Sequence, residues 1–562
     1  MLMKSEEITI LSLLEKYKNW VESGDIQFLE KGSDEQEKVL ECLSPLQKEF
    51  EDAYKKARER DGNNTQKKTT DYSSDLEWHE AHEKGRDLWE KLASCALNNI
   101  DPNSKGNSKL FKFMKEATAF EDILYGLEPY YRDHTLHSLW VYFLGEHILR
   151  DHIPAIHENL NWYLYNDIER DKKVDKYSDE FVKKAKNKEE ELCEKINLNR
   201  DAIWCITALC HDLGYSLSKL NELNQKVINV LNFFDLSNYR QFGYSFDVED
   251  QYIVTQFLEL MAMDIRLVPP YPEDKKGEVS EKVVMKCYRD DSSYWRLCRA
   301  LEGKRHGIVS SYIIYKLLGI FADSSVRGPA EEWGLDKDEV IDNVIRGDIL
   351  FAIAQHNLEF AHLKQLSSLA DILAFVDELE EFSRYGRQLL SRKYYDTTAN
   401  VKVKIEPSEK TSPDIEQGDD LDITIEYKVA EHLDENEFYG FFMRKAERLC
   451  EFYSLDQEDF DNYPITNGGS KRNKFCSINS IKMVVRPVEG STLSKLYLSL
   501  EKNTERSVIY LPATTFDGTD LGGGECKASC IDDKIIIHYP ARDLSPARDL
   551  SLKEWFGVKN GY

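Results

Sequence analysis

His211 and Asp212 are adjacent residues whose types could perform chemistry, and they end an apolar run in the stretch "CITALCHDLGYSLSK". Burying an imidazole or a carboxylate without a partner costs free energy, so both groups need one. One interpretation is an ordinary helix C-terminus, with Gly214 as the left-handed cap and His211 near the negative end of the helix dipole. The other is a metal centre, because neutral imidazole and carboxylate are ligands of divalent metal ions.

His137 lies on the apolar face of a helix that the sequence predicts within residues 130–149. Trp140, Val141 and Leu144 follow it at the spacings i+3, i+4 and i+7, which places them on the face that packs inward. A single histidine on such a face is usually a core residue with its hydrogen bonds satisfied. Because a His-Asp pair follows further along the chain, we interpret His137 as a metal ligand.

Three later helical segments carry further candidate ligands. His306 begins the apolar segment "HGIVSSYIIYKLLG", and His356 ends the segment "DILFAIAQH". The segment "LADILAFVDELEEFSR" contains two carboxylates in apolar surroundings, Asp371 and Asp377. Their separation corresponds to about 600° of helix rotation, so the two side chains lie about 120° apart and do not readily serve the same ion.

Taken in chain order, these residues resemble the H…HD…D signature of the HD-domain metal-dependent phosphohydrolases. "HSLWV" is similar to the first motif of that family, "CHDLGYSLSK" to the second and "FVDELEEFSR" to the last, which favours Asp377 over Asp371 as the final ligand. His306 and His356 match the extra histidines of two-metal members, including the HD-GYP type, although the GYP motif itself is absent. The resemblance covers residues 130–387. It implies a metal site formed by His137, His211, Asp212 and Asp377, extended in a two-ion version by His306 and His356, with His211 and Asp212 as the catalytic pair.

The resemblance implies one or two divalent metal ions as the cofactor. Hydrolysis of a phosphoester or phosphoanhydride bond needs a hydroxide at neutral pH and positive charge on the phosphoryl oxygens, and a bound metal supplies both. Asp212 is the natural ligand to bridge two metal ions. Imidazole-rich sites suit Mn, Fe, Co, Ni or Zn better than Mg or Ca, which prefer oxygen ligands.

Basic residues beside the motifs are candidates for binding the phosphate groups of a substrate. Lys219 follows His211 by eight residues, and a lysine after the HD pair commonly contacts phosphate in relatives. Asp133 and His134 lie beside the first motif, where they could either orient a metal ligand or cap a helix. Four arginines flank the other motifs, and each has the alternative of an ordinary surface salt bridge: Arg132, Arg305, Arg384 and Arg387.

The resemblance implies hydrolysis of phosphorylated nucleotides. Among the relatives we rank deoxynucleoside triphosphate triphosphohydrolases first, on the frequency of that activity in the family, and a part in bacterial anti-phage defence is compatible with it. "GYSLSK" stands where many triphosphohydrolases have a histidine-rich segment, and the extra histidines are typical of two-metal phosphodiesterases. The alternatives are therefore a cyclic nucleotide phosphodiesterase with a two-metal HD site and a non-catalytic nucleotide-sensing protein.

The composition of the chain indicates which kinds of partner the protein could bind and in which compartment we expect it. The formal net charge of −27 disfavours binding to long nucleic acids or to anionic membranes, which attract basic surfaces. No apolar run approaches a transmembrane span, the N-terminus lacks a signal-peptide pattern, and the 11 cysteines are scattered. We expect a cytoplasmic protein with reduced thiols, whose partner is a nucleotide or another small phosphorylated substrate.

The 562 residues are too many for one hydrophobic core, so the sequence predicts several domains in a mainly α chain. Residues 1–128 are predicted as an N-terminal helical region. Residues 129–395 are predicted as an all-helical HD-domain core with a charged helical insert at about 160–200. Residues 396–420 are polar and contain two prolines, as is typical of a linker or an exposed loop. Short alternating or apolar stretches over residues 421–562 predict a C-terminal α+β accessory or regulatory domain, which could bind a partner protein or a second copy of the chain.

Overall fold

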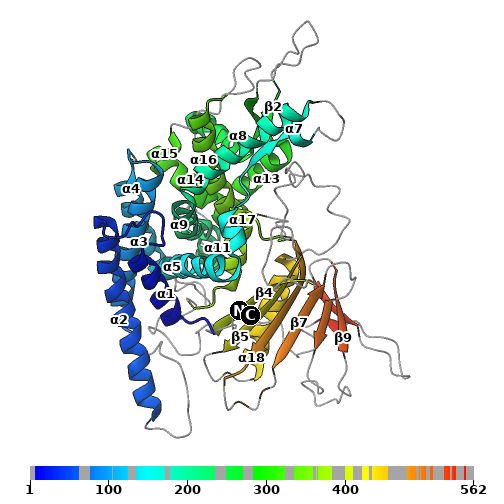
Figure 1. The fold of residues 1–562 in the computed structure, drawn as a ribbon. Helices are drawn as coiled ribbons and strands as arrows, with labels where there is room; N and C mark the ends of the chain where they lie inside the picture. The colour runs from blue at the N-terminus through cyan, green and yellow to red at the C-terminus, as the bar shows by residue number, and fades with distance from the viewer. Residues whose placement is uncertain are drawn as a thin grey trace, which may run out of the picture.

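The computed structural model combines a large helical body with a long C-terminal β-sheet, which confirms the mainly α fold class with an α+β part (Figure 1). The structure describes residues 7–62, 76–103, 105–124, 134–170, 177–233, 248–269, 283–322, 335–358, 363, 365–382, 399–408, 420–429, 433, 435–452, 477–488, 491, 493, 495–501, 507–510, 525–531, 534–538 and 550–551.

Four helices form the N-terminal part of the helical body: α1 (Ile10–Ser23), α2 (Asp34–Gly62), α3 (Trp78–Ile100) and α4 (Asn107–Leu124). α1 begins with a capping box in which Thr9 and Ser12 exchange hydrogen bonds. It ends at Gly24, whose φ of 82° is a left-handed conformation that favours glycine. α3 packs on α2, α5 and α9, and it thereby connects this region to the centre of the body.

Five central helices carry the sequence motifs: α5 (His134–His147), α9 (Arg200–Cys210), α14 (His306–Leu317), α16 (Lys337–Gln355) and α17 (Leu369–Leu379). All 14 residues of α5 are buried, and α9 is buried from Asp201 to Cys210. Because α5, α9, α14 and α17 are predominantly apolar and α16 is apolar in its second half, these helices pack on one another rather than face water. α9 packs on α5 and α16, α14 packs on α16, and α17 packs on α5 and α16. The motif residues therefore meet inside one bundle.

Shorter helices and a small sheet surround this bundle. The helices are α6 (Pro154–Glu158), α7 (Asp167–Arg170), α8 (Asp179–Asn197), α10 (Tyr215–Ser218), α11 (Leu220–Asn232), α12 (Val248–Met261), α13 (Asp291–Glu302) and α15 (Gly319–Ala322), with a π-helix, η2, at Ile148–His152. The sheet consists of β1 (Leu164–Asn166), β2 (Met263–Val268) and β3 (Val284–Arg289), with β1 parallel and β3 antiparallel to β2. The sequence does not predict this sheet. α8 lies in the charged insert, but it buries one face through Phe181 and Leu192 and packs on α16.

Eight strands form the C-terminal sheet in the order β11-β10-β9-β8-β7-β6-β5-β4. Their bounds are β4 (Ala399–Pro407), β5 (Leu421–Val429), β6 (Ile478–Arg486), β7 (Leu496–Glu501), β8 (Ser507–Tyr510), β9 (Glu525–Ile531), β10 (Lys534–His538) and β11 (Leu550–Ser551). Neighbouring strands are antiparallel except β5 and β6, which are parallel and are connected through α18 (Glu435–Phe452). β4 lies within residues 396–420, so the prediction of a linker there is wrong for this stretch.

The sheet contacts the helical body through β4 and α18. The Ile8 amide donates to the Val401 carbonyl at 2.8 Å, and the Asn400 side chain donates to Glu7 at 2.9 Å. Figure 1 shows the sheet beside the helical body, with β4 and β5 below α17, and β4 is the edge strand of the sheet. Among the described residues, no helix is both long and apolar enough to span a lipid bilayer.

Candidate metal centre

Side chains from five helices or helix ends converge at one buried point of the helical body. Each helix is positioned by its apolar face, and the ligands are the polar exceptions on these otherwise apolar surfaces. The structure brings all six predicted metal ligands together: His137 on α5, His211 at the C-cap of α9 with Asp212 directly after it, His306 at the start of α14, His356 at the C-cap of α16 and Asp377 on α17.

The first cluster contains His137, His211, Asp212 and Asp377. Nε2 of His137 lies 3.2 Å from Nε2 of His211 and 3.0 Å from Oδ1 of Asp377. Oδ2 of Asp212 lies 3.5 Å from Nε2 of both histidines. His137, His211 and Asp377 therefore offer donor atoms of the types that divalent metal ions take within 4.8 Å of one another, and Asp212 adds an oxygen beside both imidazoles.

The second cluster shares Asp212 with the first. Oδ1 of this carboxylate lies 3.3 Å from Nε2 of His306 and 3.5 Å from Nε2 of His356. The two imidazole nitrogens are 3.1 Å apart. The two oxygens of Asp212 thus face different pairs of histidines, which is the placement expected of a bridging ligand.

Hydrogen bonds behind the imidazoles fix which ring nitrogen faces the clusters. Nδ1 of His137 lies 2.7 Å from Oε2 of Glu380, and Nδ1 of His211 lies 2.8 Å from the carbonyl oxygen of Ala208. Nδ1 of His356 lies 2.6 Å from the carbonyl oxygen of Ile353. A carbonyl oxygen can only accept and a carboxylate accepts, so each Nδ1 carries the proton and donates it. Nε2 is left as the basic atom that could bind a metal ion.

This tautomer assignment tests whether a cation fits. With Nδ1 protonated on both His137 and His211, the two Nε2 lone pairs face each other across 3.2 Å, and they repel unless a positive charge lies between them. That charge is either a proton or a metal ion. The donor set and its arrangement therefore fit a divalent metal ion.

The charges of the centre alter the pKa values of its members in the ion-free protein. Burial favours the neutral form of His211, but the carboxylate of Asp212, helped by that of Asp377, outweighs it and raises the pKa of His211 to about 9. Burial alone would raise the pKa of Asp212, but the surrounding imidazoles, first that of His211, hold it well below its ordinary value. Burial lowers the pKa of His306 to about 3, and Asp212 offsets this only in part. The centre therefore holds an ionised carboxylate and a proton that a metal ion could displace.

Asp371 lies outside the centre. Its Oδ2 accepts hydrogen bonds from the backbone amides of Ser367 and Ser368, at 3.2 and 2.9 Å, where α17 begins. It is the residue that completes the capping box with Ser368. Asp377 lies six residues later on this helix, and its carboxylate faces the imidazoles.

α9 ends at His211, as the helix-end interpretation predicts, but Gly214 is not the predicted left-handed cap. Its φ is −86°, and its amide donates to Oγ of Ser310 on α14 at 2.8 Å. A Cβ at this position would lie 2.6 Å from the backbone nitrogen of Ser310. The glycine is needed because the turn after the His-Asp pair approaches α14 closely.

The predicted phosphate-binding residues are only partly described. Lys219 lies between α10 and α11, with Nζ 5.2 Å from the ring centroid of Tyr215. The Tyr215 ring in turn lies 4.0 Å from that of His134 and 5.5 Å from that of His306. Arg305 directly precedes His306 as the N-cap residue of α14. Three predicted residues lie outside the described residues: Arg132, Arg384 and Arg387.

Sequence reasoning missed Glu380 and left the role of His134 open. Glu380 is fully buried and orients His137. Its position three residues after Asp377, at helical spacing, is the signal that could have indicated it. Nε2 of His134 lies 3.8 Å from Oδ2 of Asp212, which supports the orienting role over a solvated cap.

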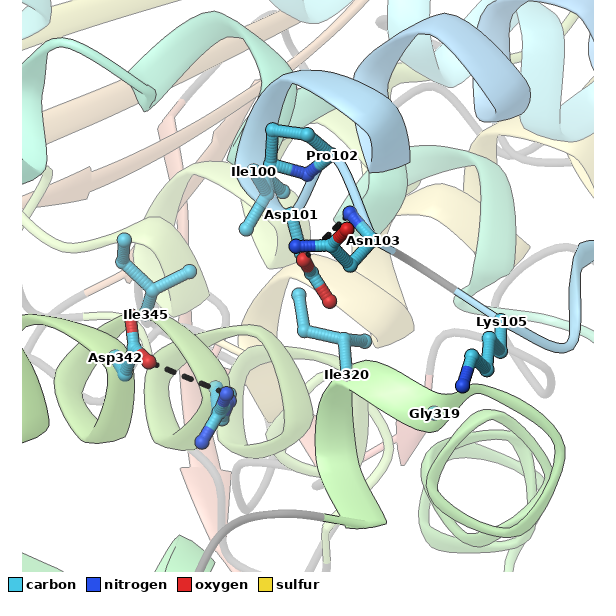
Figure 2. Close-up of a pocket in the computed structure, with 10 residues that line it drawn as sticks. Ile100, Asp101, Pro102, Asn103, Lys105, Gly319, Ile320, Asp342 and Ile345 are labelled. Carbon is cyan, nitrogen blue, oxygen red and sulfur yellow. Dashed lines mark hydrogen bonds and ion pairs between the residues drawn. The ribbon is translucent and has the colours of Figure 1, made fainter.

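A separate pocket of about 340 Å³ lies between the end of α3, the connection from α3 to α4, α15 and α16 (Figure 2). Its charged residues are largely engaged with their own neighbours. Arg346 pairs with Asp342 at 3.3 Å, and Asp101 accepts a hydrogen bond from the amide of Asn103 at 2.9 Å. None of the ligands of the two clusters lines this pocket, so it is not the candidate site.

No model of a known protein family matches the chain, and neither a curated protein nor a solved structure matches it. The likeness to HD-domain phosphohydrolases therefore rests on the motif residues themselves. The geometry establishes a buried group of histidines and aspartates that could hold a metal ion.

Proposed function

We propose that this protein is a metal-dependent phosphohydrolase of the HD-domain type that acts on phosphorylated nucleotides. The observation that carries the proposal is the position of Asp212. One of its oxygens faces His137 and His211, and the other faces His306 and His356. A carboxylate between two groups of imidazoles suits two divalent ions that act together on one phosphoryl group.

The residues have separate roles in this proposal. A bound divalent ion would supply a hydroxide at neutral pH and positive charge beside the phosphoryl oxygens. Glu380 keeps the His137 ring oriented, while Lys219 and Arg305 are the candidates among the described residues for binding phosphate oxygens of the substrate. Imidazole donors favour Mn, Fe, Co, Ni or Zn over Mg. The first ion would be held by His137, His211, Asp212 and Asp377, and the second by Asp212, His306 and His356.

Deoxynucleoside triphosphates are the first candidate substrate class, with release of inorganic triphosphate, and the motif resemblance alone supports this choice. A part in anti-phage defence is proposed together with this first substrate class. Cyclic nucleotides are the second candidate, because His306 and His356, 3.1 Å apart beside a shared carboxylate, favour a two-ion phosphodiesterase. A nucleotide sensor would bind the same ligands without turnover.

The test is a nucleotide panel with separated products. Full-length protein purified without chelator is incubated with Mn²⁺ and deoxynucleoside triphosphates, ribonucleoside triphosphates or cyclic nucleotides. Release of triphosphate supports the first candidate, and ring opening of a cyclic nucleotide supports the second. The His211→Ala/Asp212→Ala variant is the control and should lose both metal and turnover. Metal and nucleotide binding without any product would identify a sensor and contradict the hydrolase.

A further inference from the structure

The end of α17 faces two different parts of the protein. Asp377 and Glu380 face His137 in the metal centre, at 3.0 and 2.7 Å from its two ring nitrogens. Glu378 and Glu381 face the C-terminal part, where they pair with cations of α18. Five consecutive residues therefore carry both a candidate metal ligand and the contacts with the sheet region.

Lys445 of α18 is the principal contact on the C-terminal side. Its Nζ donates to the backbone carbonyl of Glu378 at 2.8 Å, lies 3.4 Å from Oε1 of the same residue and forms an ion pair with Glu381. The side chain of Lys445 is 2% exposed and that of Glu381 is 0% exposed. The Tyr427 ring of β5 lies 5.1 Å from the same Nζ.

These contacts provide hydrogen-bond partners that the last turn of a helix lacks. The last carbonyls of a helix lack intrahelical partners and carry partial negative charge, so a cation placed there stabilises the end. Lys445 provides both the donor for the Glu378 carbonyl and the positive charge. Arg448, which is half exposed, adds a 2.9 Å bond to the Glu378 carboxylate. α17 is thereby held at its last turn, which is the turn that carries Asp377.

We propose that Lys445 is a positioning residue for the first metal cluster. By fixing the end of α17 it keeps Asp377 and Glu380 directed at His137, so the C-terminal sheet region is a part of the metal centre rather than an independent appendage. The inference rests on the metal centre of the proposed function, but not on which substrate is hydrolysed. A ligand or partner that displaces α18 would weaken metal binding, and metal binding would resist that displacement by the same factor.

The test compares Mn²⁺ binding by full-length variants below their unfolding temperatures. Lys445→Met keeps the length of the side chain but removes its charge and its donors. Residues that orient metal ligands typically change affinity about 10–100-fold, so we expect the dissociation constant of the tighter ion to rise at least about tenfold. Lys404→Met is the matched control, because Lys404 lies on β4 of the C-terminal sheet with its side chain 49% exposed. Among the described residues it pairs with its near neighbour Glu406, at 2.6 Å, and not with the end of α17. This control should bind Mn²⁺ like the wild type.

A buried carboxylate left without its lysine could prevent folding of Lys445→Met. The double variant Lys445→Met/Glu381→Met removes both buried charges and still breaks the contact with the Glu378 carbonyl, so weakened Mn²⁺ binding is expected there too. Hydrogen exchange at residues 376–382 should increase in both variants. A dissociation constant within twofold of the wild type in either folded variant, or an equal loss in Lys404→Met, overturns the proposal.

The same titration separates this inference from the proposed function. Wild-type protein that binds Mn²⁺ but hydrolyses no nucleotide would refute the hydrolase while the Lys445 comparison still decides the positioning role. Wild-type protein that binds no Mn²⁺ would overturn the metal centre and the positioning role together.

Discussion

Replacing Asp377 by asparagine tests the last ligand of the proposed metal centre. Asparagine is nearly isosteric with aspartate but neutral, so packing is kept while the negative charge 3.0 Å from Nε2 of His137 is lost. Substituting residues that merely orient metal ligands lowers affinity about 10–100-fold. The loss of a direct ligand should therefore raise the dissociation constant by at least about 100-fold.

This change in affinity converts into a change in stability. An ion present at 100 times its dissociation constant stabilises the folded state by about 2.7 kcal/mol. If Asp377→Asn raises that constant about 100-fold, the same ion concentration stabilises the variant by only about 0.4 kcal/mol. Unfolding with and without Mn²⁺ should show this loss directly, and the variant should also lose nucleotide hydrolysis.

Asp371→Asn is the matched control on the same helix. Asp371 accepts from the amides of Ser367 and Ser368, and asparagine retains one acceptor oxygen for them. We expect a cost of about 1 kcal/mol or less at the start of α17, with metal binding and hydrolysis unchanged. The opposite pattern would assign the ligand to Asp371. Full metal binding and activity in both variants would refute the fourth motif altogether.

The remaining predictions concern the second cluster and the response to pH. His356→Ala removes one imidazole beside Asp212, so elemental analysis should find one ion fewer and turnover should be lost; full metal content with retained turnover would reject the two-ion arrangement. An ion must displace the proton that a pKa of about 9 places on His211, so affinity for Mn²⁺ should rise about tenfold per pH unit from about pH 7 to 9, and a pH-independent affinity would contradict this. In the ion-free protein, folding raises the pKa of His211 from 6.5 to about 9, so the protonated imidazole stabilises the folded state. This stabilisation of about 3 kcal/mol is complete below pH 6.5 and is lost as the pH rises to about 9. Urea unfolding in the presence of chelator would measure the loss.

The helices that carry the candidate site could be predicted because their signals are local. Apolar residues at helical spacing indicate α5, α9, α14, α16 and α17, and histidines on their faces or at their ends stand out against those patterns. Their convergence is not a local property. Nε2 of His306 and Nε2 of His356 lie 3.1 Å apart although 50 positions separate them in the chain. No spacing rule gives that distance, and only the resemblance to a known motif order suggested it.

Where sequence reasoning failed, contacts between distant segments determined the structure. Glu380 stands among other acids and resembles a solvated residue, but a histidine 243 positions away donates to it and it is fully buried. The stretch 396–420 resembles a linker because its prolines and charges dominate its composition. Its first part nevertheless pairs with β5 as strand β4, whose valines and isoleucine alternate with polar residues and are buried.

At His211, the same hydrogen bond both satisfies the helix end and orients a candidate metal ligand. The helix-end interpretation and the metal-centre interpretation of this residue are therefore compatible. His211 is the C-cap residue of α9, and its Nδ1 donates to the carbonyl of Ala208, one of the last carbonyls that the helix leaves without an intrahelical partner. His356 repeats this arrangement at the end of α16 with the carbonyl of Ile353. In both cases, satisfying the helix end fixes the tautomer and directs a basic Nε2 toward Asp212.

The same helix ends also favour the charge that the centre would bind. The C-termini of α9 and α16 carry partial negative charge, and both point toward the shared carboxylate, so their fields add to its attraction for a cation. His137 lies within a helix, and it obtains the equivalent orientation from the carboxylate of Glu380. Two histidines are therefore oriented by the backbone and one by a side chain, which explains why the loss of Glu380 or of the contacts that hold it should affect the first cluster more than the second.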